Sequence, residues 1–145
     1  MSYELIIEQC SPTLAGIKTG SLFSVPNEDK KEFKENIKRL NSVLVPRGLR
    51  LIPVKQLKNR VLIYLYRPNR LKRDLENSLA ENILLQKNYP TDNADRCVAE
   101  LIKRLKSGED FPHEVGLFLG YPAEDVNGFI KYGAKNAKYN GVWRV

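Results

Sequence analysis

The sequence lacks the features that identify membrane and secreted proteins. None of its apolar runs approaches the roughly 18–20 residues that a membrane-spanning helix needs. Its first residues contain neither a basic region nor an apolar stretch, so we expect no secretion signal. Cys10 and Cys97 are 87 positions apart and form no disulfide framework. We therefore expect a cytoplasmic protein that does not contact membranes.

Motifs of the common cofactor and metal sites are also absent from the sequence. There is no Gly-x-Gly-x-x-Gly motif, no phosphate-binding loop and no Cys-x-x-Cys pair. The only soft metal ligands are Cys10, Cys97 and His113, and their spacing matches no common metal site. We predict no metal site, and the sequence points to no particular cofactor. Whether the protein is an enzyme stays open at this stage.

The composition is that of one folded, basic domain. Hydrophobic residues make up 42% of the chain and charged residues 28%, a balance that excludes disordered and collagen-like proteins. The chain has 24 Lys and Arg against 17 Asp and Glu, which gives a net charge of +7. Its 145 residues suffice for one hydrophobic core, so we predict a single domain over residues 1–145.

Hydrophobic patterning predicts an α+β fold with a small mixed or antiparallel sheet. Residues 3–9, with a β-branched centre, are predicted as an N-terminal strand, and residues 49–67 as a hairpin. Pro53 cannot donate a hydrogen bond to a neighbouring strand, so its strand is expected at an edge or with a bulge. The strand-like residues 139–145 are expected to add a further edge strand.

Apolar residues at helical spacing predict five or six helices that cover this sheet. Ser11 and Pro12 are typical of a helix start, and Gly120 and Gly133 are typical of helix ends. The last three helices are expected to form a C-terminal helical unit. The predicted helices are residues 12–23, 28–44, 68–84, 93–105, 111–119 and 123–132.

Two long segments carry a family resemblance. The first runs from Cys10 to Phe23 and the second from Phe111 to Ile130, and the residues at 65–68 and 141–145 agree with them. On these segments the chain resembles the bacterial family called domain of unknown function 3793. The resemblance implies no established activity. It implies an origin in anaerobic Gram-positive bacteria and a gene near those of flavodoxins, so a flavodoxin is an expected partner.

One candidate catalytic pair is Cys10 with His113. Cys10 is predicted just before a helix N-terminus, whose positive end favours a thiolate, and Lys18 would add positive charge. His113 is the only imidazole, and Asp110 or Glu114 would orient its ring. With Cys10 as nucleophile and His113 as base, these residues would support thiol, acyl or redox chemistry.

The same residues also have ordinary structural interpretations. A cysteine at the end of an element is often simply buried, and a histidine after a proline is often a capping or surface residue. Sequence order does not establish that Cys10 and His113 meet in space. Within the closing segment, only His113, Glu114, Glu124 and Asp125 have no obvious packing role, which makes them the first residues to mutate.

The second candidate site is a basic surface. Residues 36–73 contain eleven Lys and Arg and neither Asp nor Glu. If the hairpin and the ends of its flanking helices share a face, that face is strongly positive. The candidate binding residues are Arg50, Lys55, Lys58, Arg60, Arg67, Arg70 and Arg73.

Three interpretations of this basic segment remain. It is a solvated surface, a docking face for an acidic protein such as a flavodoxin, or a nucleic-acid surface. In the last case Tyr64 and Tyr66, on one side of their strand, would stack on bases, although the sequence contains no nucleic-acid-binding motif. The functional hypotheses are therefore a reactive-thiol protein and a non-catalytic binding module.

Overall fold

The computed structural model describes residues 1–108 and 111–132. The chain divides into two compact units, residues 1–69 and 70–145, and each is described by itself. The prediction of a single domain stays a prediction. The expected tail strand at 139–145, the helix end at Gly133 and the candidate Asp110 lie outside the described residues. Within the described ranges, no helix combines the length and the apolar character needed to cross a membrane.

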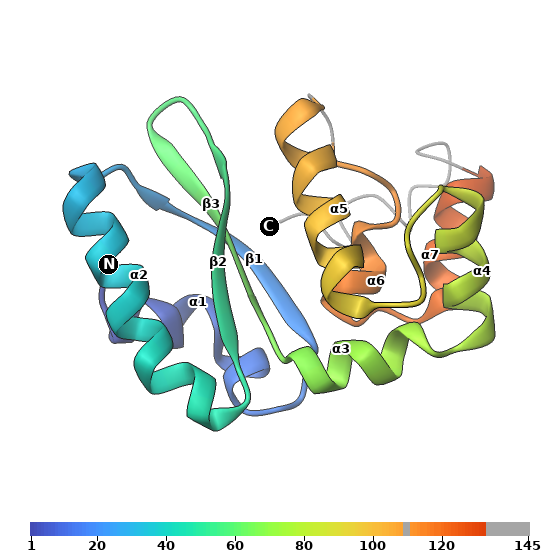
Figure 1. Ribbon diagram of the computed structural model, residues 1–145, viewed down its shortest axis with the longest axis horizontal. Helices are drawn as coiled ribbons and strands as arrows, with labels where there is room; N and C mark the ends of the chain where they lie inside the picture. Colours follow the sequence, from blue (N-terminus) through green and yellow to red (C-terminus); the bar gives the residue numbers. More distant parts are fainter. Residues whose placement is uncertain (109–110, 133–145) are drawn as a thin grey trace. The chain divides into compact units, whose positions relative to one another are not determined.

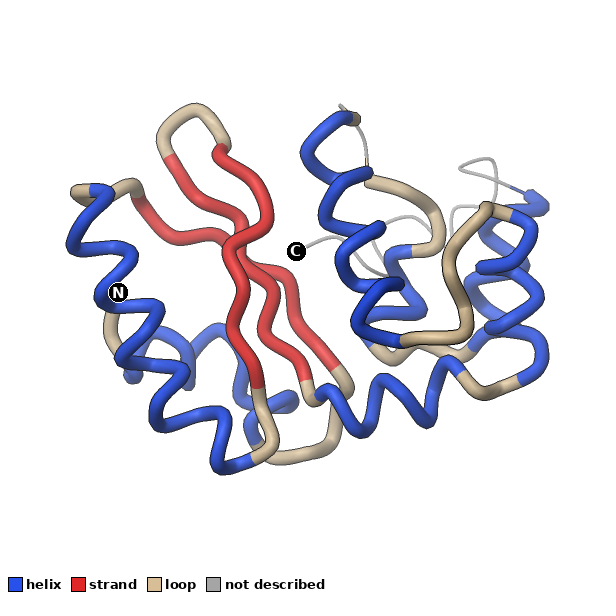
Figure 2. Tube along the Cα trace, in the orientation of Figure 1, coloured by secondary structure: helices blue, strands red, loops and turns tan. Residues whose placement is uncertain are grey.

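Unit 1 is a three-stranded antiparallel sheet with two helices on one of its faces (Figure 1). The strand order is β1-β3-β2, so β3 is the central strand and both of its neighbours are antiparallel to it. Figure 2 shows the three strands side by side in red. The predicted α+β class is confirmed. In chain order the elements are α1 (Tyr3–Leu14), β1 (Gly20–Pro26), α2 (Lys30–Leu44), the 3-10 helix η1 (Val45–Arg47), β2 (Arg50–Gln56) and β3 (Arg60–Tyr66).

The prediction of a strand at residues 3–9 is wrong, because this segment is helical and belongs to α1. Ser2 caps the helix, its Oγ accepting a hydrogen bond from the Leu5 N–H at 3.2 Å. Ile6 and Cys10, one turn apart, are both fully buried. Burial of this helical stripe outweighs the strand preference of two adjacent isoleucines, since strand propensity depends strongly on context. The first strand of the sheet is β1, in residues where we expected the end of a helix.

The hairpin prediction is confirmed by β2 and β3. Pro53 lies on β2, which is an edge strand, and the register shifts by a bulge between Pro53 and Lys55. Both of the alternatives expected for this proline therefore occur together. On the outer edge of β2, the Asn41 amide donates to the Leu51 carbonyl and accepts from the Leu51 N–H, each at 2.9 Å. This side chain from α2 satisfies the backbone groups that a neighbouring strand would otherwise pair.

The core of unit 1 lies between the sheet and the two helices. Alternate residues of the strands face α1 and α2, as the two-residue period of a strand requires. The fully or almost fully buried members of this cluster are Ile6, Cys10, Phe23, Val25, Leu40, Leu44, Leu49, Leu51, Ile63 and Leu65.

Unit 2 is helical over its described residues. The helix predicted from residue 68 to 84 is broken in two, because Asn77 caps a new helix by accepting the Ala80 N–H at 3.0 Å. The helix predicted from residue 111 begins only at Val115, whereas the prediction over 123–132 is confirmed. The helices that follow β3 are α3 (Pro68–Leu75), α4 (Ser78–Gln86), α5 (Ala94–Ser107), α6 (Val115–Leu119) and α7 (Ala123–Tyr132).

Candidate functional site

Cys10 lies at a kink inside α1. Its backbone angles, φ −130° and ψ 22°, are not helical, and Pro12 follows it within the helix. The break expected at Ser11 and Pro12 therefore exists as a kink rather than as the start of a separate helix. The Cys10 side chain is fully buried in the core of unit 1. Its sulfur has no access to solvent in this conformation.

The surroundings of Cys10 keep its thiol protonated. Burial raises the pKa of Cys10 to about 12, although a hydrogen bond with Ser21 and the charge of Lys18 act in the opposite direction. Ser21 Oγ also lies 2.7 Å from Thr13 Oγ1. Burial in turn lowers the pKa of Lys18, while the proximity of Cys10 raises it. The fold thus brings Cys10 close to Lys18 and Ser21, but the thiol carries no negative charge at neutral pH.

His113 belongs to unit 2 and is exposed to solvent. Its ring meets the Phe129 ring edge-on, with the two centroids 4.9 Å apart. Cys10 belongs to unit 1, so the pairing of Cys10 with His113 stays a prediction.

Glu114, next to His113, belongs to a buried polar network within unit 2. Its carboxylate accepts a hydrogen bond from the Tyr89 hydroxyl at 2.7 Å, and the Arg104 guanidinium lies 3.4 Å away. Arg104 also bonds the Glu100 carboxylate at 2.8 Å, and its guanidinium carbon lies 4.1 Å above the Tyr89 ring. Burial, followed by the bond to Glu114, raises the pKa of the Tyr89 hydroxyl. The side chain expected to orient His113 is therefore bound to Tyr89 and Arg104.

Sequence reasoning missed this network. The only available signal was Glu100 with Arg104, an i,i+4 pair of a kind that is common on exposed helices. Nothing in the spacing of Tyr89, Arg104 and Glu114 indicates that they meet. The network joins α5 to the segments before and after it, and a buried carboxylate of this kind is expected to have structural partners.

Positive charge is concentrated in unit 1. Residues 1–69 contain twelve Lys and Arg and six Asp and Glu, and 12 − 6 gives +6. Residues 70–145 contain twelve and eleven, and 12 − 11 gives +1. No acidic residue follows Glu35 in unit 1, so the second half of this unit carries its excess charge.

Two of the predicted binding arginines are bound within the fold. The Arg67 guanidinium donates to the carbonyl oxygens of Thr13 at 2.9 Å and Leu14 at 2.8 Å, at the end of α1. A third contact joins it to the Arg47 carbonyl at 3.4 Å. The Arg60 guanidinium donates to both the hydroxyl and the carbonyl oxygen of Ser24, each at 2.8 Å. Arg67 thus joins α1 to β3, and Arg60 joins β1 to β3.

Two turns that contain glycines with positive φ border the guanidinium of Arg67. Gly16 has φ 77° and Gly48 has φ 83°, a left-handed conformation that favours glycine. A Cβ added to either glycine would lie 3.8 or 3.7 Å from the guanidinium. Both turns therefore border the Arg67 head group, which supports a structural role for this arginine.

The sheet register separates the other basic residues of unit 1. Leu51, Ile63 and Leu65 face the helices, so Arg50 and Lys55, opposite Tyr66 and Leu62 in the register, lie on the other face. Lys58 is exposed in the β2–β3 turn. A different exposed set, Lys38, Arg39 and Arg47, lies on α2 and η1. Arg70 and Arg73, the remaining predicted binding residues, belong to α3 in unit 2.

Tyr64 and Tyr66 are stacked on each other instead of being presented to a ligand. Their ring centroids are 4.5 Å apart, with an angle of 4° between the ring planes. Both side chains are almost completely buried. The base-stacking role considered for these tyrosines requires exposed rings, which this conformation does not offer.

Comparison with known proteins places the chain in a family without adding an activity. In the described part of the chain, no three His, Cys, Asp or Glu side chains are grouped as a metal site. No curated protein and no solved structure matches the chain. The family model described as "Protein of unknown function (DUF3793)" matches residues 6–145, and the chain therefore belongs to this family.

Proposed function

We propose that this protein is a non-catalytic binding module whose unit 1 docks the acidic surface of a flavodoxin-like protein. The observation that carries the proposal is the net charge of +6 in unit 1, combined with a row of exposed cations on α2 and η1. Charge segregated in this way attracts an oppositely charged protein and accelerates the encounter. The implied neighbourhood of flavodoxin genes supplies the partner class.

The docking surface that we propose consists of Lys38, Arg39, Val43, Val45 and Arg47. Arg39, Val43 and Arg47 follow one another at steps of four, so they lie on one side of α2 and its continuation η1. Val43 is 43% exposed and Val45 56% exposed, so this segment offers apolar contacts as well as charges. Lys38 and Val45, seven positions apart, lie along a second strip of the same helical segment. Exposed apolar side chains beside cations suit a protein surface, because a protein partner can bury them.

The same features make nucleic acid a poorer partner. Phosphate contacts need only cations, and base recognition usually adds exposed aromatic rings. Tyr64 and Tyr66 are buried, and Arg60 and Arg67 already donate to groups of unit 1. The exposed large hydrophobic residues on α2 and η1, the elements that carry Lys38, Arg39 and Arg47, are Val43 and Val45 rather than aromatic residues.

The docking surface rests on a rigid support. Asn41, on the same helix, binds both backbone groups of Leu51 at 2.9 Å and so fixes α2 to the edge strand β2. Leu40 and Leu44 are buried in the core beneath the helix. A surface held in this way loses little conformational entropy on binding, which favours affinity.

The test is titration of a purified, acidic flavodoxin against the full chain at several salt concentrations. We expect binding at low ionic strength that weakens steeply with added NaCl. The triple variant Lys38→Gln, Arg39→Gln, Arg47→Gln should weaken binding by about tenfold or more, mainly through slower association.

A matched control exists on the same helix. Lys30, Lys31 and Lys34 are exposed, and Lys30→Gln, Lys31→Gln, Lys34→Gln removes the same amount of charge from the other end of α2. The control should retain most of the affinity. An equal loss in both variants, no flavodoxin binding at low salt, or equally tight binding of DNA or RNA would overturn the proposal.

A further inference from the structure

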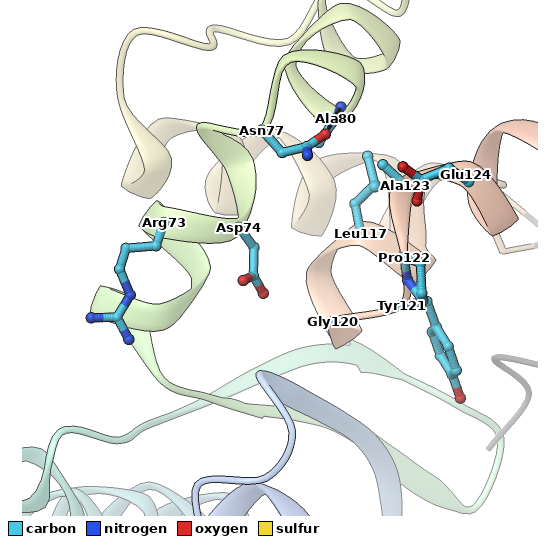
Figure 3. Close-up of a pocket in the computed structure, with 10 residues that line it drawn as sticks. All are labelled: Arg73, Asp74, Asn77, Ala80, Leu117, Gly120, Tyr121, Pro122, Ala123 and Glu124. Atoms are coloured by element: carbon cyan, nitrogen blue, oxygen red, sulfur yellow. Dashed lines mark hydrogen bonds between the residues drawn. The ribbon is translucent and has the colours of Figure 1, made fainter.

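A cavity of about 350 Å³ in unit 2 lies beside the α3–α4 turn and the α6–α7 turn (Figure 3). Arg73 is one of its lining residues, but Figure 3 shows its guanidinium directed away from Asn77 and from the cavity. Asp74 already interacts with another group of the protein. The described lining therefore does not present the opposite charges that would orient a polar ligand. The feature that suits recognition lies instead on the surface of unit 1.

That feature is Ile17, in the loop between α1 and β1. Its side chain is 73% exposed, the largest fraction among the large hydrophobic residues that the structure describes. Single exposed apolar residues are common on protein surfaces and carry no meaning by themselves. Ile17 differs from such residues in the rigidity of its loop and in its position beside the docking surface.

Backbone hydrogen bonds fix the loop that carries Ile17. The Pro12 carbonyl accepts from the Ile17 N–H at 2.9 Å and from the Lys18 N–H at 3.1 Å. The Gly16 N–H donates to the Thr13 carbonyl at 3.1 Å, and the positive φ of Gly16 turns the chain. The Ile17 side chain therefore projects from a defined backbone, so little conformational entropy is lost when a partner covers it.

Arg67 places this loop beside the docking surface. Its guanidinium donates to the Arg47 carbonyl, and a Cβ added to Gly16 or to Gly48 would lie 3.8 or 3.7 Å from the same guanidinium. Ile17 follows Gly16, and Arg47 precedes Gly48, so both residues belong to turns that border one head group. Figure 2 shows the α1–β1 loop and the turn before β2 at the same end of the sheet. Ile17 thus extends the docking surface beyond η1.

We propose that Ile17 is the apolar anchor of the docking surface and packs against an apolar patch within the acidic surface of the flavodoxin-like protein. The inference rests on the proposed function, because it takes the same partner and extends the same surface. Charges act over roughly 8–10 Å at moderate ionic strength, so the cations guide the encounter. An apolar contact acts only once the surfaces touch, so Ile17 slows dissociation.

Other occupants suit this surface less well. In a symmetric dimer the same surface of both copies meets, and the cations of α2 and η1 would face one another. Binding to a lipid surface scales with the apolar area inserted, and one isoleucine with two valines offers little. A protein that surrounds an apolar patch with acidic groups is complementary to both the cations and Ile17.

The experiment measures the rates of association and dissociation of a purified, acidic flavodoxin with the full chain at low ionic strength. Ile17→Ala should raise the dissociation rate by about tenfold or more and leave the association rate and its salt dependence within about twofold. The triple variant Lys38→Gln, Arg39→Gln, Arg47→Gln should show the opposite pattern, with a loss mainly in the association rate. Because the Ile17 side chain is mostly exposed, its truncation leaves the core unchanged.

Leu57→Ala is the matched control. Leu57 is 37% exposed in the β2–β3 turn beside Lys58, at the end of the sheet opposite the turn before β2 (Figure 1). The substitution removes the same number of carbon atoms as Ile17→Ala from another exposed side chain next to a cation. Both rates should stay within about twofold of those of the unmodified chain.

The outcomes separate the anchor from the proposed function. If the flavodoxin does not bind, both fail. If it binds through the cations but Ile17→Ala leaves the dissociation rate unchanged, or Leu57→Ala raises it equally, only the anchor fails. Sedimentation with phosphatidylserine vesicles and analytical ultracentrifugation of the chain alone test the other occupants. Vesicle binding or self-association that Ile17→Ala abolishes would assign this side chain to a membrane or to a second copy and overturn the proposal.

Discussion

Raising the pH should destabilise this protein through the buried thiol of Cys10. The folded state holds the pKa of Cys10 at about 12, compared with an ordinary value of 9.0. Above pH 9 the unfolded chain loses this proton while the folded chain keeps it. Stability that depends on the protonated thiol is therefore complete below about pH 9 and is lost as the pH rises toward 12.

The size of the effect follows from the two pKa values. At pH 10 an unfolded thiol is about 90% ionised and the folded one about 1%, so the linkage costs about 1.4 kcal/mol of unfolding free energy relative to pH 7. Cys97 contributes a similar loss, because burial raises its pKa to about 11. Lys18 acts in the opposite direction, since a lowered pKa makes its folded form easier to deprotonate.

The Cys10 contribution is isolated by working without Cys97. Urea unfolding of Cys97→Ala and of the double variant Cys10→Ala, Cys97→Ala is measured from pH 7 to pH 10. Subtracting the two curves removes the contributions of titrating groups that do not interact with Cys10, and the difference that remains belongs to Cys10 together with its coupling to Lys18. We expect the difference to change by about 1.4 kcal/mol over this range.

Alkylation of Cys97→Ala by iodoacetamide tests the same thiol directly. A pKa three units above 9.0 reduces the thiolate fraction at pH 7.5 about a thousandfold, so folded protein should react at least that much more slowly than urea-unfolded protein. The rate should rise about tenfold for each pH unit. A plateau at or below pH 9, with a rate that falls in His113→Ala, would refute this reasoning and favour the reactive-thiol hypothesis.

Three further predictions concern side chains that hold the fold together, all measured by urea unfolding at neutral pH. Arg67→Ala should cost about 2–3 kcal/mol, because it leaves carbonyl oxygens at the end of α1 without their charged donor, whereas Arg50→Ala should change stability by less than about 0.5 kcal/mol. Glu114→Ala should cost about 3 kcal/mol, and Glu114→Gln should recover part of this loss by keeping an acceptor for Tyr89. Asn41→Ala should lower the free energy of unfolding by about 1–3 kcal/mol and expose the edge of β2. For each of the three side chains, a variant with unchanged stability would contradict the role assigned to it.

The parts of the fold that sequence predicts well have strong local signals. The hairpin combines two apolar runs rich in strand-forming residues with a short polar connection. Pro53 has no N–H group to donate, which indicates an edge strand or a bulge. The helix at residues 28–44 has a regular apolar spacing and becomes α2. In each case the local pattern and the tertiary burial agree.

The errors occur where local preference and tertiary burial disagree. Ile6 and Ile7 favour a strand locally, yet the capping of α1 by Ser2 and the burial of Ile6 with Cys10 make the segment helical. The sequence pattern does not indicate a helix start at Asn77, because the apolar stripe continues past this residue from Leu75 to Leu79. Its cap divides what periodicity alone indicates as one helix.

The candidate sites show a related limit. Cys10 and Lys18 are eight positions apart, and the fold brings them together, but sequence carries no signal of the burial that keeps the thiol protonated. The basic segment was recognised from composition, whereas the internal partners of Arg60 and Arg67 depend on contacts 36 and 53 residues away. A charge count cannot distinguish a cation that holds the fold from one that is left for a partner.

The position of a cation within its element provides this distinction. Arg67 follows the end of β3 near two glycine turns, where its planar guanidinium reaches several carbonyl oxygens, a geometry that lysine cannot reproduce. Lys38 and Arg39 lie on the polar face of an amphipathic helix, where the Arg39 guanidinium donates to the side-chain oxygen of Asn36 on the same helix at 3.0 Å. Neither Lys38 nor Arg39 lies in the last turn of α2, where the helix dipole favours cations, so their neutralisation should change stability by less than about 0.5 kcal/mol each, and loss of Lys30 in the first turn should be neutral or slightly favourable. The affinity of the two α2 triple variants for the flavodoxin must therefore be compared under conditions where both variants are fully folded. If the two variants then bind equally well, these cations stabilise the helix and do not contribute to docking.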